Sequence, residues 1–282
     1  INRLYIDSTG FLWLATDRGL NRFDAYKVQQ LPLAGDAQVE LDISQVLEDS
    51  QQRFFVAAKN QGLYQIDLQT SAAELLTPLQ QLESDTIPQL LDVIEQQPDL
   101  LLLAINKAVY QLQLPGKQLT QIFEFDGGNS LMSRVRLLKK FNQLLLIGTT
   151  RGLYVYDLKT QQHWLVALTT QSRERGGQVV RSLEVSDDLL YLAIGSQFYQ
   201  LTEAQLRQSA TAPIDSAPVL TDLQINKILP YFNKLLLGTN KGLYLATPGA
   251  AQAELLWRFT DSVHEVDQDS ITDLVRTPDG GF

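Results

Sequence analysis

The sequence has no cysteine, only two histidines and no long apolar run. Without cysteine there is no disulfide framework, thiolate nucleophile or cysteine-type zinc site, and an oxidising and a reducing compartment fit equally well. The longest apolar segments, such as 100–105, have the length of a strand and fall well short of the roughly 18 to 20 residues that span a bilayer. No charged-then-apolar leader opens the sequence. We therefore expect any membrane anchor to lie outside these residues.

The chain is acidic. Its 282 residues carry a formal net charge of −9, and 44% of them are hydrophobic. The summed field of such a chain repels phosphates, so nucleic acid is not an expected partner. The hydrophobic content is sufficient for a sizeable buried core.

One pattern recurs along the whole sequence. Residues 10–24 form an apolar strand, a polar turn closed by Gly19, and a second strand that ends in an acid. The pattern returns at 144–157 and 235–244, with weaker copies at 54–67, 101–112 and 190–201. The apolar residue after each turn recurs every 43 to 46 residues, as Leu20, Leu63, Val109, Leu153, Phe198 and Leu243. A fixed period of this length with strands inside each unit is typical of a β-propeller blade.

Each repeat is expected to hold four strands, a to d. The predicted a strands are 2–6, 43–48, 89–94, 135–139, 180–185, 225–229 and 271–276. A small residue after each b strand lets neighbouring blades approach, at Ala15, Ala57, Ala104, Gly148, Gly195 and Gly238. In the fifth repeat, the polar stretch 205–218 is predicted to be an inserted loop instead of a clear d strand.

The sequence thus predicts an all-β fold, a β-propeller of six repeats plus the first strand of a seventh. A ring of seven blades is the first choice, and a six-bladed or open one is the alternative. Residues 1–282 form one propeller domain, which we expect to be a fragment of a longer receptor ectodomain because the sequence stops where a repeat is starting.

Residues 6–26 resemble the first repeat of the two-component regulator propeller family. The shared features are an acid and a turn before Gly10, then apolar-Trp13-apolar, Thr16, Gly19-Leu20, and an ending of Asn-Arg-aromatic-Asp. Ala25 stands where that repeat often has glycine, and residues 129–131 and 269–271 resemble the segment that precedes strand a. The resemblance implies a periplasmic sensor of a membrane-spanning protein with a histidine kinase, hybrid kinase or diguanylate cyclase output.

Signs of catalysis are sparse. Neither His163 nor His264 lies in a metal-binding spacing or beside a nucleophile, and no phosphate-binding glycine loop or nucleophile elbow is present. The acidic residues 261, 265, 267 and 269 lack the spacing of a calcium loop. Tyrosines one residue past the repeat marker are expected in the core rather than on a sugar platform. We expect no enzyme activity, catalytic residue, metal or cofactor in this fragment.

The candidate site is the set of turns that join strands b and c, which we call the b–c turns. Five of the six carry one cation, and the fifth repeat has Gln197: the cations are Arg18, Lys59, Lys107, Arg151 and Lys241. In a propeller these turns share one face, so the cations would surround one mouth of the central channel and favour an anionic ligand, such as an acidic sugar, or an acidic partner surface. The alternative explanation is that hairpin turns commonly carry polar residues, exposed lysine and arginine among them.

The expected partners follow from the family resemblance and from the cations of the b–c turns. They are a small ligand, anionic or an oligosaccharide, a neighbouring propeller or immunoglobulin-like domain of the same chain, and a second copy in a homodimer. A membrane would be contacted only through segments outside this fragment. A protein-interaction scaffold is the second hypothesis, and a propeller lyase or hydrolase is the third.

Overall fold

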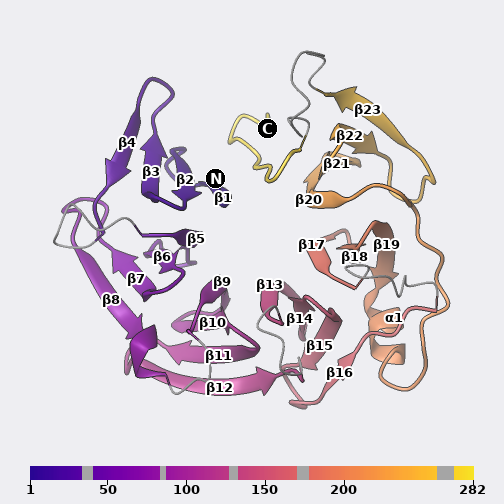
Figure 1. The fold of residues 1–282 in the computed structure, drawn as a ribbon, viewed down its shortest axis with the longest axis horizontal. Coiled ribbons are helices and arrows are strands. Elements are labelled where there is room, and N and C mark those ends of the chain that lie inside the picture. The colour runs from indigo at the N-terminus through magenta and orange to yellow at the C-terminus, as the bar shows by residue number, and fades with distance from the viewer. Residues whose placement is uncertain (34–40, 83–86, 127–132, 170–177, 259–269) are drawn as a thin grey trace. The chain divides into compact units, whose positions relative to one another are not determined.

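The structure is a computed structural model that describes residues 1–33, 41–82, 87–126, 133–169, 178–258 and 270–282. These residues form six antiparallel sheets, the six blades of an all-β propeller fold (Figure 1). The chain divides into two compact units, residues 1–135 with 275–282 and residues 136–274. Each unit holds three blades.

In the first unit every blade is a four-stranded meander in which each strand pairs with the next along the chain. Blade one consists of β1 (Arg3–Ile6), β2 (Leu12–Thr16), β3 (Gly19–Phe23) and β4 (Val28–Leu31). Blade two consists of β5 (Ile43–Glu48), β6 (Phe54–Ala58), β7 (Gly62–Ile66) and β8 (Ala73–Pro78), followed by the short 3-10 helix η1 (Leu79–Gln81). Blade three consists of β9 (Leu90–Gln97), β10 (Leu100–Ile105), β11 (Ala108–Gln113) and β12 (Gln118–Glu124).

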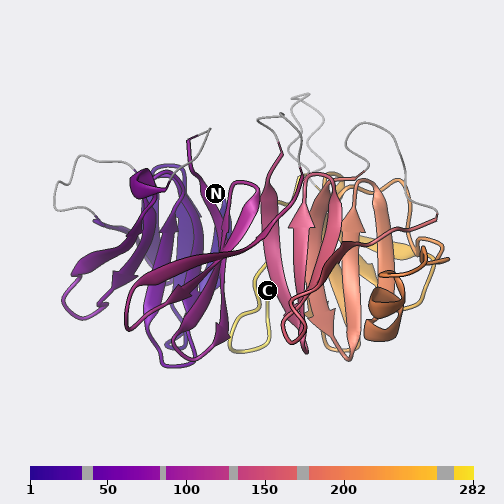
Figure 2. The same cartoon turned by 90° about the horizontal axis from the view of Figure 1, so that it is seen from below.

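The second unit repeats this plan with one exception. Blade four consists of β13 (Val135–Phe141), β14 (Leu144–Thr149), β15 (Gly152–Asp157) and β16 (His163–Leu165). Blade five has three strands, β17 (Val180–Ser186), β18 (Leu189–Ile194) and β19 (Gln197–Thr202), and continues into the helix α1 (Glu203–Gln208). Blade six consists of β20 (Ile225–Tyr231), β21 (Lys234–Thr239), β22 (Gly242–Ala246) and β23 (Ala253–Trp257). Within each blade the turns lie at the two opposite ends of the strands (Figure 2).

The core lies between neighbouring blades of a unit. Every residue of β6 and of β14 is buried, as expected for continuous apolar b strands with a sheet on each side. Between blades one and two, Trp13 packs on Phe54 with ring centroids 4.6 Å apart. The expected core position holds in full for two of the five tyrosines past the repeat marker, since Tyr64 and Tyr199 are 8% and 0% exposed. The other three, Tyr110, Tyr154 and Tyr244, are half-buried.

The small residue predicted for each b strand is confirmed in five blades, where it pairs with the repeat marker. In blade five the prediction named the wrong residue, Gly195. There Ala193 pairs with Phe198, the register that Gly148 and Leu153 share in blade four. Gly195 lies in the following turn. At the two glycines the space is tight, because a Cβ on Gly148 would lie 2.7 Å from Val180 of the next blade and one on Gly238 would lie 2.7 Å from Ile271.

The polar stretch 205–218 is not simply a loop. Thr202 and Gln205 form a capping box that starts α1, and the buried Leu206 anchors the helix. The indole N–H of Trp164 in blade four donates to the carbonyl oxygen of Leu206 at 3.0 Å. The chain then returns to pair Leu220 with Phe198 at the edge of blade five, where a d strand would lie.

The segment 271–276 was expected to open a seventh blade and forms no strand. The Ile271 N–H donates to the carbonyl oxygen of Thr239 at 2.9 Å, and Asn226 donates to the carbonyl oxygen of Ile271 at 3.0 Å. The segment thus lies against blade six, but no following strand in the described residues pairs with it, so no ladder forms. The first choice of seven blades is therefore not supported, and the six-bladed alternative is confirmed.

Candidate ligand and partner surface

A repeated turn positions three of the five predicted cations. In blades one, four and six, a threonine hydroxyl at the end of strand b donates to the carbonyl oxygen of the glycine that starts strand c, at 2.7 to 2.8 Å. The same hydroxyl oxygen accepts the main-chain N–H of Arg18, Arg151 or Lys241, at 2.9 to 3.2 Å. The glycine has a positive φ in each case, which explains the Thr-x-x-Gly spacing.

In the first unit the three cations differ in their surroundings. Arg18 is exposed, and its carbonyl oxygen accepts a hydrogen bond from the Gln30 side chain at 2.8 Å. Lys59 forms an ion pair with Asp42 at 2.9 Å, and Lys107 lies 3.8 Å from Glu124. Two of the three positive charges are therefore partly neutralised by acids of their own blade.

In the second unit Arg151 is exposed and the ammonium group of Lys241 lies 3.5 Å from the carbonyl oxygen of Asp222. Blade five, where the sequence offered only Gln197, also has a cation at its b–c turn. Arg181 from β17 donates through Nε to the carbonyl oxygen of Gly195 at 3.0 Å. Burial lowers the pKa of this guanidinium. Arg181 belongs to β17 and not to a b–c turn, so the turn sequences give no sign of it.

The a strands carry polar side chains that link neighbouring blades. In the first unit Gln45 donates to the carboxylate of Asp92 at 2.9 Å. In the second, Lys139 forms an ion pair with Glu184 at 2.6 Å and Lys227 one with Asp273 at 2.8 Å. These contacts join β5 to β9, β13 to β17, and β20 to the segment after blade six.

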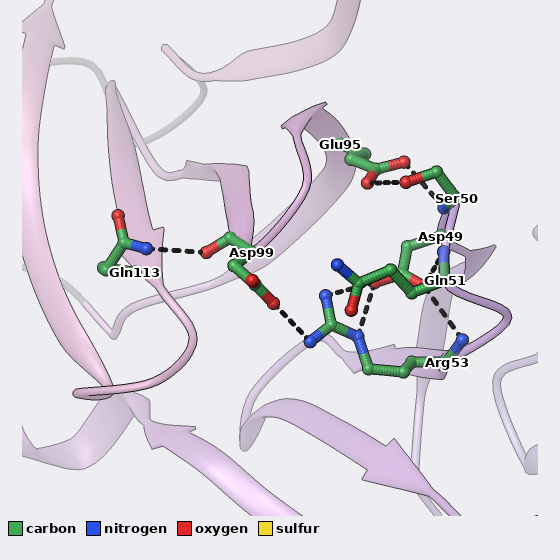
Figure 3. Close-up of polar contacts among 7 residues, drawn as sticks. All are labelled: Asp49, Ser50, Gln51, Arg53, Glu95, Asp99 and Gln113. Carbon is green, nitrogen blue, oxygen red and sulfur yellow. Dashed lines mark hydrogen bonds and ion pairs between the residues drawn. The ribbon is translucent and has the colours of Figure 1, made fainter.

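The turns between strands a and b, which we call the a–b turns, hold a second polar network in the first unit (Figure 3). Arg53 donates to Asp49 at 2.7 Å and to Asp99 of blade three at 2.6 Å. Burial disfavours the charged guanidinium, but the two carboxylates more than offset this effect and raise the pKa of Arg53. Asp49 also accepts the main-chain N–H groups of Gln51 and Arg53, so its side chain fixes the turn. The network therefore joins blade two to blade three through Arg53 and Asp99.

A comparable network fastens α1 to blade four in the second unit. Arg207 lies 2.7 Å from Asp157 and 2.8 Å from Glu203, and Asn142 donates to Glu203 at 2.7 Å. The hydrogen bond from Arg207, with two main-chain N–H groups, lowers the pKa of Asp157 to about 2. The bond from Asn142, followed by that from Arg207, lowers the pKa of Glu203.

The other candidates for chemistry are the two histidines and the acidic residues near the C-terminal end of the sequence. His163 is exposed on β16 and stacks on Tyr156 with ring centroids 6.4 Å apart. His264, the acidic residues 261 to 269 and the segment 129–131 lie outside the described residues. Among the residues that the structure describes, no three histidine, aspartate or glutamate side chains gather as a metal site would require. In the same part of the chain, no helix has the length and apolarity of a bilayer span.

No protein-family model and no curated protein sequence matches the chain. Solved structures share its fold. The extracellular domain of BT4673 from B. thetaiotaomicron is 17 to 18% identical in two crystal structures, with TM-scores of 0.74 and 0.72. One of these structures is assigned to a one-component system and the other to a hybrid two-component system. The extracellular domain of BT3049 from the same organism, also assigned to a hybrid two-component system, is 15% identical with a TM-score of 0.74.

The alignments to these two proteins cover 99% of this chain but only 36% to 38% of theirs, so the chain spans little more than a third of their length. A chain in the crystal structure of the Mitotic Checkpoint Complex is 11% identical with a TM-score of 0.67, covering 99% of this chain and 82% of its own. At such identities the likeness shows the fold alone. The fold agrees with the resemblance that residues 6–26 carry.

Proposed function

We propose that the chain is a non-catalytic, extracytoplasmic sensor module of a membrane-spanning signal-transduction protein. The observation that supports this most strongly is the alignment of 99% of the chain with extracellular domains assigned to signalling systems. The first-repeat pattern of residues 6–26 supports it independently. A periplasmic location follows from the same family resemblance.

We propose further that residues 1–282 are a single propeller domain within a longer receptor ectodomain. The chain matches little more than a third of each BT protein, which leaves room there for other domains. A neighbouring propeller or an immunoglobulin-like domain of the same polypeptide is then a natural partner, because propeller blades offer broad turn surfaces for docking.

The ligand or partner is proposed to bind at the b–c turns. Arg18 and Arg151 are the best candidates for contact with an anion, since no acidic side chain in the described ranges pairs with either guanidinium. Lys59, Lys107 and Lys241 contribute less free charge, because each has an oxygen neighbour already. A carboxylate or acidic sugar fits guanidinium groups through paired charge-assisted hydrogen bonds.

The experiment is a thermal-shift screen of the chain against acidic oligosaccharides, neutral oligosaccharides, dicarboxylates and peptides. A ligand that binds the folded state raises the melting temperature by mass action. For a hit, Arg18→Gln and Arg151→Gln should each reduce the shift, while Lys27→Gln and Lys159→Gln, at exposed turns between strands c and d of the same blades, should not. Equal effects of all four variants would refute the proposed face, and no hit in any class would count against a small ligand.

A protein-interaction scaffold is the second candidate function. The likeness to a chain of the Mitotic Checkpoint Complex favours it, since that chain is part of a protein assembly. The two functions differ in what lies beyond the domain. A full-length protein with a membrane span and an output domain supports the sensor, and a full-length protein with neither supports the scaffold.

A further inference from the structure

In blades two, three, five and six the a strand contains a β-bulge at its second residue. The bulged residues are Ser44, Leu91, Arg181 and Asn226. Ser44 Oγ donates to the carbonyl oxygen of Leu90 at 2.7 Å, so it joins β5 to β9. Asn226 Nδ2 donates to the carbonyl oxygen of Ile271 at 3.0 Å in the same way. In blade five the position holds an arginine, the one charged residue of the four.

Arg181 bonds within its own blade and lacks a counter-ion there. Its Nε donates to the carbonyl oxygen of Gly195 in the b–c turn at 3.0 Å. The arginine is half-buried, and burial lowers the pKa of its guanidinium. Among the residues that the structure describes, no acidic side chain forms an ion pair with it. A charge that is partly removed from water without a counter-ion is unfavourable for folding alone, which indicates a group kept for a bound anion.

The bond to Gly195 decides which edge of the guanidinium is left for a ligand. Nε is already used, and Gly195 has a φ of +59°, a conformation that suits glycine. The remaining N–H groups of Arg181 belong to the two Nη nitrogens, and no residue in the described ranges accepts a hydrogen bond from them. One N–H of each nitrogen points in parallel with the other, and this planar pair matches the two oxygens of a carboxylate.

A second cation lies at the same end of the neighbouring blade. Val180, the residue before Arg181, packs on the end of β14, since a Cβ on Gly148 would lie 2.7 Å from it. The b–c turn that follows β14 carries the exposed Arg151. The start of β17 is thus adjacent to the strand that leads into this turn.

A third cation comes from the a strand of blade four. Arg136 is the second residue of β13, as Arg181 is of β17. Three residues further along each strand, Lys139 and Glu184 join the two strands by an ion pair of 2.6 Å. The two arginines therefore occupy the same level of neighbouring a strands, and their positive charges add at the junction of blades four and five.

We propose that Arg181 anchors a carboxylate-binding site at the junction of blades four and five. Its Nη1 and Nη2 bind the two oxygens of the carboxylate, and the carbonyl oxygen of Gly195 holds the guanidinium in place. Arg136 and Arg151 strengthen the positive field around the anion. This inference rests on the proposed function, because it narrows the ligand of the b–c turns to a molecule with a carboxylate and assigns it to one junction.

The first test is calorimetric titration of the chain with glucuronate, with glucose as the uncharged counterpart and phosphate as a tetrahedral anion. Glucuronate should bind most tightly. Arg181→Gln should weaken its binding by about a hundredfold, because the buried charge is lost. Arg181→Lys keeps the charge but loses the parallel pair of donors, so the loss should be about tenfold. Arg258→Gln removes an exposed arginine of the same unit and is the control, with no change expected.

The second test needs only the original chain in its folded state. The Nε–H of Arg181 gives a signal in a ¹H–¹⁵N spectrum, which is identified by its loss in Arg181→Lys. Glucuronate should shift this signal, and glucose should not. A signal that stays in place when glucuronate is saturating would overturn the direct contact with Arg181.

The outcomes separate this site from the proposed function. Unchanged glucuronate affinity in both Arg181 variants would overturn the site. If Arg18→Gln weakens binding in that case, the ligand lies elsewhere on the b–c turns, and the proposed function stands without this inference. Tighter binding of phosphate than of glucuronate would overturn the ligand class. No binding of any probe, together with no hit in the thermal-shift screen, would count against both the site and a small ligand.

Discussion

The main-chain N–H and the hydroxyl of Ser50 both donate to the carboxylate of Glu95, at 2.8 and 2.6 Å (Figure 3). This pair of bonds fastens the a–b turn of blade two to the first strand of blade three. Ser8 makes the same two bonds to Glu48, at 2.7 and 2.6 Å, between blades one and two. The same serine–glutamate clamp therefore joins both pairs of adjacent blades in the first unit, beside their apolar contacts.

Glu95→Gln should lower the free energy of unfolding by about 1 kcal/mol, because it replaces two charge-assisted hydrogen bonds by neutral ones and leaves one donor poorly matched. Urea denaturation measures the loss. Glu254→Gln, at an exposed carboxylate of β23, is the matched control and should change stability by no more than about 0.5 kcal/mol. If both variants have the same effect, the clamp does not stabilise the junction.

Gly62→Ala should destabilise the protein severely, by about 3 kcal/mol or more. Gly62 has a φ of +140°, and an added Cβ would lie 1.8 Å from the carbonyl oxygen of Thr77 on the neighbouring strand. Gly116→Ala is the control, since nothing lies within 4 Å of its Cβ position, and it should be neutral or slightly stabilising. Thermal or urea unfolding of the two variants compares them directly; a small loss for Gly62→Ala would mean that this turn relaxes.

The blades were predictable because their information is local and repeated. Gly19, Gly62, Gly152 and Gly242 all start a c strand with positive φ, so the turn, the strand pairing and the repeat marker follow from short sequence windows. The helix α1 also has a local signal in the sequence. Thr202 and Gln205 have the spacing of a capping box, and Gln205 is the first residue of the stretch interpreted as a loop.

The candidate site was less predictable because its charges are set by residues distant in sequence. Lys59 is paired by Asp42, and Lys107 lies near Glu124, each 17 residues from its partner. No period in the sequence marks such pairs. Arg181 reaches a b–c turn from an a strand, a geometry that depends on the position of β17 beside the turn after β18. The structure places the five cations in b–c turns, as their sequence windows predict, while their role in binding a ligand stays a prediction. Their free charge could be judged only from the structure.

Ala25→Gly should stabilise the protein by about 1 kcal/mol. Ala25 has a φ of +71° and is exposed, in a turn whose conformation Asp24 fixes by accepting the N–H groups of Tyr26 and Lys27. Glycine adopts this conformation without the steric cost that a Cβ brings. Ala72→Gly, in an exposed turn without positive φ, should instead cost up to about 1 kcal/mol. A loss of stability in both variants would show that the strain at Ala25 is negligible.

Acid should release the contact between α1 and blade four through Asp157. The pKa of Asp157 is lowered to about 2, chiefly by the hydrogen bond from Arg207, against 3.8 in the absence of these interactions. Because the pKa of this carboxyl is lower in the folded than in the unfolded state, its ionised form stabilises the folded state at pH values above the unfolded-state pKa. This contribution to stability is lost as the pH falls from about 4 toward 2. The contribution is on the order of 2 kcal/mol, since the Asp157 side chain is 8% exposed.

Urea titrations between pH 6 and about pH 2 should therefore show a shallower loss of stability in Arg207→Gln than in the original chain. Trp164 fluorescence reports on the helix, because the indole of Trp164 bonds to Leu206. Arg258→Gln removes an exposed arginine of the same unit and should leave the pH dependence as it was. Identical pH profiles for the original chain and Arg207→Gln would contradict this role of the pair.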